Sequence, residues 1–363
     1  MLPSAAKLWV KSHGLMREHY HNSYLNGIIL TVIPRELPFI QDVYAIPYLI
    51  CKIVSVSSFA PGVRFMAITK RRLPTFLQFG KSLNLSQKLM LIGLAITLFF
   101  IFLAFFAPVF QAWGWLQNPK DFLSNPIHEP PSAKYWFGTS RLGYDVFSRT
   151  LFGAQAALQV VILATALSMI IGVPLGMLSG YLGGKLDKVL LFIMDSIYTL
   201  PGLLLSVTLA FVVGRGILNA AIAISIAYIP QYYRVVRNHT VSVKTEVFIE
   251  AAQAMGASTW VVLSRYLFFN VIQSVPVLFT LNAADAILVL GGLGFLGLGL
   301  PEEVPEWGHD LKQALEALPT GIWWTTLFPG LTMTCMVVGL SLLGEGLNEF
   351  VNPRLRRENR IRK

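Results

Sequence analysis

The sequence predicts an all-α protein that crosses a membrane several times. Hydrophobic residues make up 54% of the 363 residues and charged residues only 13%, and the mean hydropathy is +0.59. Soluble domains carry roughly 25% charged residues, so this chain has about half the charge expected of a protein in water. Apolar runs of the length needed to cross ~30 Å of hydrocarbon recur along the sequence, which completes the prediction of a polytopic membrane protein.

Six apolar runs are the candidate membrane spans. The first contains no charged residue, and the fourth is short and bounded by Pro230, so its ends are poorly defined. The six runs cover residues 90–110, 156–180, 189–213, 217–233, 267–290 and 325–347.

The distribution of positive charge predicts the orientation of these spans, because cytosolic loops carry an excess of Lys and Arg. If the region before the first span is cytosolic, the inner segments hold eighteen Lys and Arg and the outer loops hold six. Both termini are therefore predicted to be cytosolic (N-in and C-in), and so is the interior loop 234–265. A pI near 9.6 is thus explained by a membrane surface rather than by a nucleic acid.

Four regions are predicted along the chain. Residues 1–65 have short apolar patches broken by prolines and contain no clean signal peptide. They are either a cytosolic or interfacial extension, or a stretch upstream of a true start at Met66. Residues 66–152 contain a basic segment, the first span and an outer loop. Residues 153–353 form the transmembrane domain, and 354–363 form a basic cytosolic tail.

The interior loop 234–265 contains a short segment rich in Ala and Gly with an acidic start. Glu250, Ala251 and Ala252 begin this segment, and Gly256 follows about one and a half helical turns later. Glycine weakens or ends a helix, so Gly256 predicts a turn between two short helices. An acidic residue is also favoured at a helix start by the macrodipole. Small side chains allow another protein to approach closely, so these four residues are the candidate docking surface.

Five motifs stand in order along roughly residues 85–357. They are WFGTSRLGYDVFSRTLFGA, IGVPLGMLSGYLGGKLD, the EAAQAMG loop, GGLGFLGLGLPEEVPEWG and WWTTLFPGLTMTCMVVGLSLLGEGLNEFVNPRLR. Together they resemble the C-type permease subunits of dipeptide and oligopeptide ABC importers, a group that also includes nickel permeases. The EAAQAMG loop resembles the EAA loop that docks on the ATPase subunit. Residues 267–270 lack the proline usual at the end of this loop, so the next helix is expected to begin without a kink.

The resemblance implies a type I importer fold in the inner membrane of a prokaryote. It also implies a second permease subunit in a heterodimer, two cytosolic ABC ATPases and an extracytoplasmic solute-binding protein, all embedded in or next to membrane lipid. ATP and Mg would be bound by the ATPases, so this chain is expected to be no enzyme and to bind no cofactor. Di- or oligopeptides are the expected substrate, with nickel or another small solute as the alternative.

Two aspartates fall inside the predicted spans. A charge in a membrane costs at least ~2.5 kcal/mol on insertion scales and is a functional candidate by default. Asp195 and Asp285 are expected to face either the translocation path or the partner permease, and Asp285 could contact a cationic group of the substrate. For Asp195, structural hydrogen bonds near a helix end at Pro201 are the alternative. Asp285 stands where the family resemblance would lead us to expect a neutral residue.

Polar groups outside the spans predict local structure rather than chemistry. Asp145 and Ser148 precede the second span and are good partners for free backbone amides at a helix start, and together with Arg149 they are expected to hold the outer loop. A contact with the binding protein is the alternative. The acidic loop 291–324 is either a solvated face or a docking surface.

Other function classes find little support in the sequence. Residues 292–297 satisfy GxGxxG but follow a membrane span, and SGYLGGKL at 179–186 lacks the first Gly and the Ser or Thr of a P-loop. The six histidines show no metal-ligand spacing, and no catalytic cluster or nucleic-acid site is found. A secondary carrier independent of ATP would require ion-coupling acids that face each other, for which Asp195 and Asp285 are the only candidates.

Overall fold

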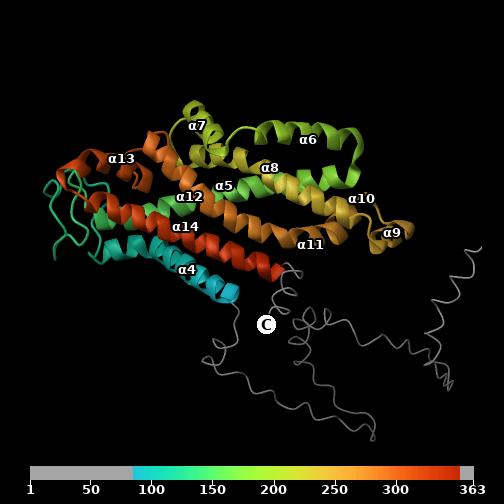
Figure 1. Ribbon diagram of the computed structural model, residues 1–363, viewed down its shortest axis with the longest axis horizontal. Helices are drawn as coiled ribbons and strands as arrows, with labels where there is room; N and C mark the ends of the chain where they lie inside the picture. The colour runs from blue at the N-terminus through green and yellow to red at the C-terminus, as the bar shows by residue number, and fades with distance from the viewer. Residues whose placement is uncertain (1–84, 352–363) are drawn as a thin grey trace, which may run out of the picture. The chain divides into compact units, whose positions relative to one another are not determined.

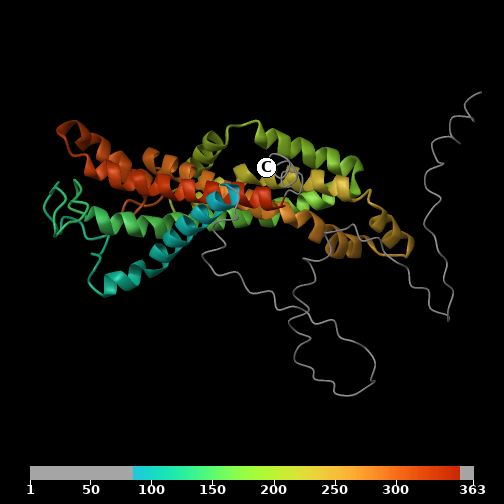
Figure 2. The ribbon, with the colours of Figure 1, turned by 60° about the horizontal axis from the view of Figure 1, so that its bottom comes forward.

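The computed structural model describes residues 85–351, which form an elongated bundle of helices (Figures 1 and 2). Within this part of the chain no regular strand forms, and Thr139 and Asp145 make an isolated antiparallel bridge. The α-helices are α4 (Leu85–Ala112), α5 (Val146–Leu182), α6 (Gly184–Tyr198), α7 (Gly202–Val213), α8 (Ile217–Val243), α9 (Val247–Ala254), α10 (Thr259–Val261), α11 (Phe268–Val271), α12 (Val275–Leu296), α13 (Trp307–Ala317) and α14 (Trp324–Val351). The extension 1–65, the alternative start at Met66 and the tail 354–363 lie outside the described residues.

Four helical segments in the described range are long and apolar enough to cross a membrane. They are α4, α5, the continuous run Thr259–Leu296 and the segment Trp324–Glu349 of α14. The run Thr259–Leu296 passes through a π-helical turn at Val262–Leu267 and a 3-10 turn at Ile272–Ser274 without breaking. The all-α, multi-pass fold class is therefore confirmed.

The predicted unbroken span 189–213 is wrong. The chain forms α6 and α7 instead, two helices bent by 88° that together could make a fifth span. Pro201 stands at the start of α7. A proline disfavours helical conformation in the residue before it, so the helix cannot run through Leu200, and the chain turns there.

Helix α8 contains the predicted span 217–233 and continues to Val243. Its second half carries Gln231, Arg234 and Arg237, which lowers its hydropathy. These polar residues are tolerated because α8 packs against α5, α6, α7 and α12 rather than standing alone. The count of six spans and the N-in/C-in orientation remain predictions.

Helices α5 and α8 pack closely because glycines repeat on one face of α5. Gly172, Gly176 and Gly180 are spaced by four residues and are all buried. A Cβ on Gly172 would lie 2.7 Å from the Tyr232 Cβ, and one on Gly180 would lie 2.8 Å from the Arg237 carbonyl oxygen. Small residues at this spacing let two membrane helices approach closely.

Helix α4 lies on α14 with its other side uncovered by the rest of the described chain. Gly93 and Gly339 make the contact, since a Cβ on Gly339 would lie 2.6 Å from a methyl carbon of Ile96. Phe99 and Phe105 are 57% and 75% exposed. Because such apolar exposure is unfavourable in water, this side of α4 is suited to contact lipid.

Candidate functional site

The predicted turn in the interior loop is confirmed. Helix α9 ends at Ala254, and Gly256 follows with a φ of +83°, a left-handed conformation that suits glycine. The Gly256 N–H donates to the Gln253 carbonyl at 2.9 Å, and the Ala257 N–H donates to the Ala252 carbonyl at 3.0 Å. The chain therefore reverses between two short helices, at the end of the bundle where α9 and α10 lie in Figure 1.

The four predicted docking residues do not share one face. Glu250, Ala251 and Gly256 are exposed, whereas Ala252 is only 1% exposed and faces the bundle. Ile249 is fully buried beside it and belongs to the same apolar core as Val262 of the π turn. Ala252 therefore anchors α9 to this chain, and the outward surface consists of other residues.

Large apolar side chains cover the outer surface of the loop, and none of them is among the four docking residues predicted from the sequence. Val247 is 78% exposed, Met255 79% and Trp260 74%. Large apolar side chains exposed together in one loop make this loop a candidate protein-interaction site. The signal was present in the sequence, because Met255 and Trp260 interrupt a stretch of small residues in a loop predicted to be cytosolic. We call Val247, Met255 and Trp260, with the exposed Ala251 and Gly256, the docking surface.

Two side-chain contacts fasten the loop to the C-terminal end of α5. The Lys244 ammonium donates to the Gly180 carbonyl at 2.9 Å, and the Gln253 amide donates to the Tyr181 hydroxyl at 3.1 Å. Together with the buried Ile249 and Ala252, these contacts join α9 to the long helices. The docking surface is therefore connected to α5 and α8 through contacts of this chain.

Asp195 is paired within the chain. Its Oδ1 accepts from Arg234 of α8 at 2.6 Å and 3.1 Å, and the Arg234 guanidinium lies 4.1 Å from the centre of the Tyr198 ring. About two helical turns earlier on α6, Asp187 forms a similar ion pair with Arg237 of α8, at 2.6 Å. These pairs hold α6 on α8, so the structure places Asp195 in a helix-joining ion pair.

Asp285 lies in an environment different from that of Asp195. It stands near the middle of α12 on an exposed face, and its Oδ2 accepts a hydrogen bond from the Tyr228 hydroxyl of α8 at 2.7 Å. Among residues 85–351 it forms no ion pair. The two aspartates share no partner, so the structure does not bring them together as a coupled acidic pair.

At the opposite end of the bundle, the predicted helix cap of α5 is confirmed. Asp145 Oδ2 accepts from the Ser148 N–H at 2.9 Å and from the Ser148 hydroxyl at 2.5 Å. Arg149 is 3% exposed in its side chain, binds Asp310 of α13 at 2.7 Å and donates to the Pro119 carbonyl at 3.1 Å. It therefore fastens both the outer loop and α13 to α5, as expected for its part in holding this loop.

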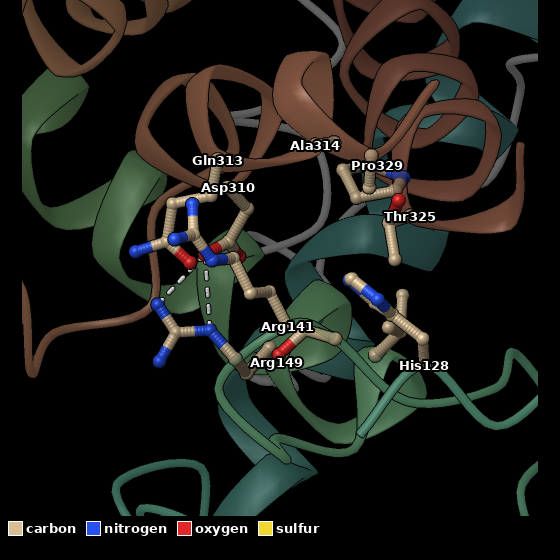
Figure 3. A pocket seen from close by; sticks show the side chains of 11 residues that line it. His128, Arg141, Arg149, Asp310, Gln313, Ala314, Thr325 and Pro329 are labelled. Atoms are coloured by element: carbon tan, nitrogen blue, oxygen red, sulfur yellow. Dashed lines mark hydrogen bonds and ion pairs between the residues drawn. The ribbon is translucent and has the colours of Figure 1, made fainter. Parts of the chain in front are cut away.

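Figure 3 shows the small cavity beside this arginine, with the Arg149–Asp310 contact as dashed lines. His128 and Arg141 of the outer loop, Gln313 of α13 and Thr325 of α14 line it. Its volume of about 20 Å³ admits about one water molecule. A solute of peptide size is therefore excluded from this cavity.

Glu306 caps α13 from a fully enclosed position. Its two carboxyl oxygens accept from the Gly308 and His309 N–H groups at 2.8 Å and 2.9 Å. A Cβ on Gly294 would overlap the Glu306 carboxyl, so glycine is required there. Burial raises the pKa of Glu306 to about 8, although the two backbone hydrogen bonds favour the ionised form. The acidic loop 291–324 thus contains at least one carboxyl group that faces neither solvent nor a partner.

The pH dependence of stability should reveal this buried carboxyl. Because its pKa rises from 4.5 to about 8, the folded chain binds more protons than the unfolded chain between these pH values. Glu306 therefore makes wild-type stability fall as pH rises through this window. We expect the melting temperature of Glu306→Gln, measured in detergent relative to wild type, to increase from pH 4.5 to pH 8.

The comparison with wild type removes a competing contribution from His309. Burial lowers the pKa of His309, so this neighbour makes stability rise with pH, but it does so in both proteins. Asp310 and Arg149 also face the Glu306 carboxyl and are likewise unchanged in the variant. A melting-temperature difference that stays constant with pH would show that Glu306 is already ionised in the folded chain.

Comparison with known proteins gives a consistent result. The family described as binding-protein-dependent transport system inner membrane component matches residues 172–357. The chain is 35% identical over 274 residues to the dipeptide transport system permease protein DppC of Alkalihalophilus pseudofirmus, covering 74% of this chain and 87% of that one.

Two further relatives have similar coverage. The probable D,D-dipeptide transport system permease protein DdpC of Escherichia coli is 34% identical, with 68% of this chain and 82% of that one covered. The oligopeptide transport system permease protein OppC of Bacillus subtilis is 33% identical, with 75% and 88% covered. With these matches and the multi-pass helical fold, the chain belongs to the binding-protein-dependent transport system inner membrane component family.

Proposed function

We propose that this chain is the permease subunit of an ABC importer for small peptides and that partner ATPases dock on the loop around α9. The observation that carries the proposal is the docking surface. Val247, Met255 and Trp260 expose large apolar side chains, while Ile249 and Ala252 behind them are buried in this chain's own core. A short helix that is anchored inside and apolar outside is suited to a cavity on another protein.

Peptides are the substrate class that the relatives support. The three relatives described above carry dipeptide, D,D-dipeptide and oligopeptide in their names. A nickel permease would belong to the same wider group, but none of these three names refers to a metal. We therefore propose di- or oligopeptide import by a multi-pass protein of a prokaryotic inner membrane.

The chain is proposed to work with several partners. These are a second permease subunit that forms a heterodimer with it, two cytosolic ATPases that bind ATP and Mg, and an extracytoplasmic solute-binding protein. Membership of a binding-protein-dependent family supports such an assembly. Hydrolysis belongs to the ATPases, so this subunit contributes the path and its movement rather than a catalytic residue.

The proposed coupling uses the contacts that fasten α9 to the bundle. ATP binding would draw the two ATPases together and move the docking surface with them. Lys244 and Gln253 join the loop to the cytosolic end of α5 at 2.9 Å and 3.1 Å, so α5 and α8 would rock with it. A substrate path that opens alternately to the two sides needs two such states of different affinity for the solute.

Reconstitution tests this function directly. In proteoliposomes that contain both permease subunits, the two ATPases and the binding protein, we expect uptake of radiolabelled alanyl-alanine to require ATP. The same vesicles with a non-hydrolysable nucleotide are expected to show no accumulation. Uptake by this chain alone, with no ATPase present, would contradict the proposal and favour an ATP-independent carrier.

A further inference from the structure

Asp285 is an exposed carboxylate near the middle of a helix that is apolar enough to span the membrane. An ionised side chain at this depth is costly unless it is paired or reaches water. Within residues 85–351 its only hydrogen bond is the one from Tyr228, and no cation of the described chain pairs with it. Asp195, by contrast, has its own arginine. The charge of Asp285 is therefore left to a group outside the described part of this chain.

Tyr228 fixes the direction of this carboxylate. The tyrosine is 2% exposed, and its hydroxyl donates to Asp285 Oδ2 at 2.7 Å, which leaves Oδ1 without a partner in the described chain. A hydrogen bond to one oxygen orients a carboxylate and still leaves strong acceptor capacity on the other. Asp285 is thus held ready to accept hydrogen bonds from a cationic donor.

Further polar groups surround the pair. Asn282 precedes Asp285 by three residues on α12, and Tyr232 follows Tyr228 by four on α8, so each lies one turn along its helix. The Asn282 amide nitrogen and the Tyr232 hydroxyl are buried against each other and make no well-formed hydrogen bond within the described chain. Unsatisfied buried polar atoms are rare and require an explanation. Together the four residues form a polar cluster within an otherwise apolar pair of helices.

We propose that Asp285, held in place by this buried cluster, binds the ammonium group of a peptide during its passage through the membrane. The inference rests on the proposed function, because the ammonium group is the cation common to the unmodified di- and oligopeptides named for the relatives. A Lys or Arg of the partner permease would satisfy Asp285 alone. The exposed Asp285 carboxylate has no cation in the described chain, and an unpaired acid inside a membrane span is typical of a substrate path.

Around the cluster, α12 presents apolar residues on the same exposed stripe. Leu281 is 41% exposed and Leu288 49%, one turn on each side of Asp285. Such a surface offers no second charge that could bind the carboxylate group of the same peptide. The cluster is therefore expected to recognise one end of the solute and to tolerate variation in the rest.

The test uses the complete transporter in proteoliposomes and alanyl-alanine as the probe. Asp285→Asn keeps the shape of the side chain and removes its charge. Because charge-assisted hydrogen bonds are roughly twice as strong as neutral ones, we expect initial uptake at low peptide concentration to fall at least about tenfold. Asp285→Glu should recover part of this loss. Leu98→Asn, which adds an amide to the exposed side of a different helix, α4, should keep wild-type uptake.

Co-purification of the second permease distinguishes a cation of the peptide from a Lys or Arg of that permease as the partner of Asp285. Under the proposal, Asp285→Asn keeps that subunit in the complex while uptake falls. Loss of the second permease from the complex would overturn the proposal and assign Asp285 to a cation of that partner. Unchanged uptake would also overturn it, and in both cases ATP-dependent uptake by wild type would leave the proposed function standing.

Discussion

Replacing Gly176 with leucine is expected to push α5 away from α8 and to destabilise the bundle strongly. A Cβ at this position would lie 2.6 Å from the Tyr233 carbonyl oxygen and 3.1 Å from the Arg237 nitrogen. Both are backbone atoms of α8, so no rotation of a side chain can relieve the overlap. The whole helix must move, and its contacts with α6, α7 and α12 must change with it.

Two opposing contributions to the free energy of unfolding decide whether Gly176→Leu stabilises or destabilises the bundle. Replacing glycine within a helix gains roughly 0.5–1 kcal/mol from reduced backbone freedom. Overpacking of a close contact costs typically about 1–3 kcal/mol and more where backbone must shift. Leucine adds three carbon atoms beyond the Cβ that already overlaps, so we expect a loss of at least about 3 kcal/mol. Thermal unfolding of the purified subunit in detergent should show this loss as a clearly lowered melting temperature.

Two variants control for the nature of the change. Gly176→Ala adds only the overlapping Cβ and should lie between wild type and leucine. Gly202→Leu adds the same leucine at the start of α7, where the nearest atom to a Cβ is the Ala227 Cβ at 3.9 Å. This second variant should unfold at nearly the wild-type temperature. Equal losses at positions 176 and 202 would show that close α5–α8 packing is not the cause.

The fold was predictable where one residue type dominates a long stretch. Apolar runs located α4, α5, α12 and α14, because lipid requires continuous hydrophobic surface whatever the tertiary contacts. The same rule failed at α6 and α7, since hydropathy does not detect a bend at Pro201. It also undervalued α8, whose arginines are matched by aspartates of α6.

The candidate site was predictable in position and only partly in composition. Gly256 identified the turn because a positive φ suits glycine. The sequence could not predict which of the small residues faces outward. Ala251 and Ala252 are neighbours of the same type, so no alternation of polar and apolar residues distinguishes the outer face from the inner one. Ala252 therefore proved to be an inward anchor. The exposed Met255 and Trp260 were overlooked, although large apolar residues in a predicted cytosolic loop are themselves a signal.

Ion pairs between residues that lie far apart in the sequence could not be predicted from it. Arg234 stands 39 residues from Asp195, and Arg149 stands 161 residues from Asp310. No local spacing rule links such positions, whereas the cap made by Asp145 and Ser148 spans a separation of three and was expected. The same distinction explains why Asp285 was identified as a candidate while its partner Tyr228 was not.

Gly256→Trp is expected to abolish coupling between ATP hydrolysis and transport. A Cβ at Gly256 meets no atom within 4 Å, so the indole would project from the docking surface without disturbing this chain's own packing. It would occupy space that the proposed ATPase must fill. We expect the subunit to fold, but the complex either to lose the ATPases on purification or to hydrolyse ATP with uptake reduced at least about tenfold.

The substitution also strains the backbone, and the strain can be measured separately. Any residue other than glycine with the φ of +83° costs about 1–2 kcal/mol. Gly256→Asn carries the milder form of this cost, since asparagine tolerates the left-handed conformation, and it adds little bulk. It should therefore keep most of the transport activity and all of the ATPase in the complex.

Gly321→Trp provides the matched control for bulk and strain together. Gly321 has a φ of +82°, no atom lies within 4 Å of its Cβ, and it lies near α13 at the other end of the bundle from α9 (Figure 1). The same indole is thus added to the same backbone conformation at the other end of the bundle, so the ATPase content and the ATP hydrolysis of the two complexes can be compared directly. If both tryptophan variants retained the ATPases and full uptake, α9 and its turn would not be the docking site. If only Gly256→Trp fails, the failure lies in the contact that this loop makes with its partner, because strain, bulk and an added aromatic surface are common to both.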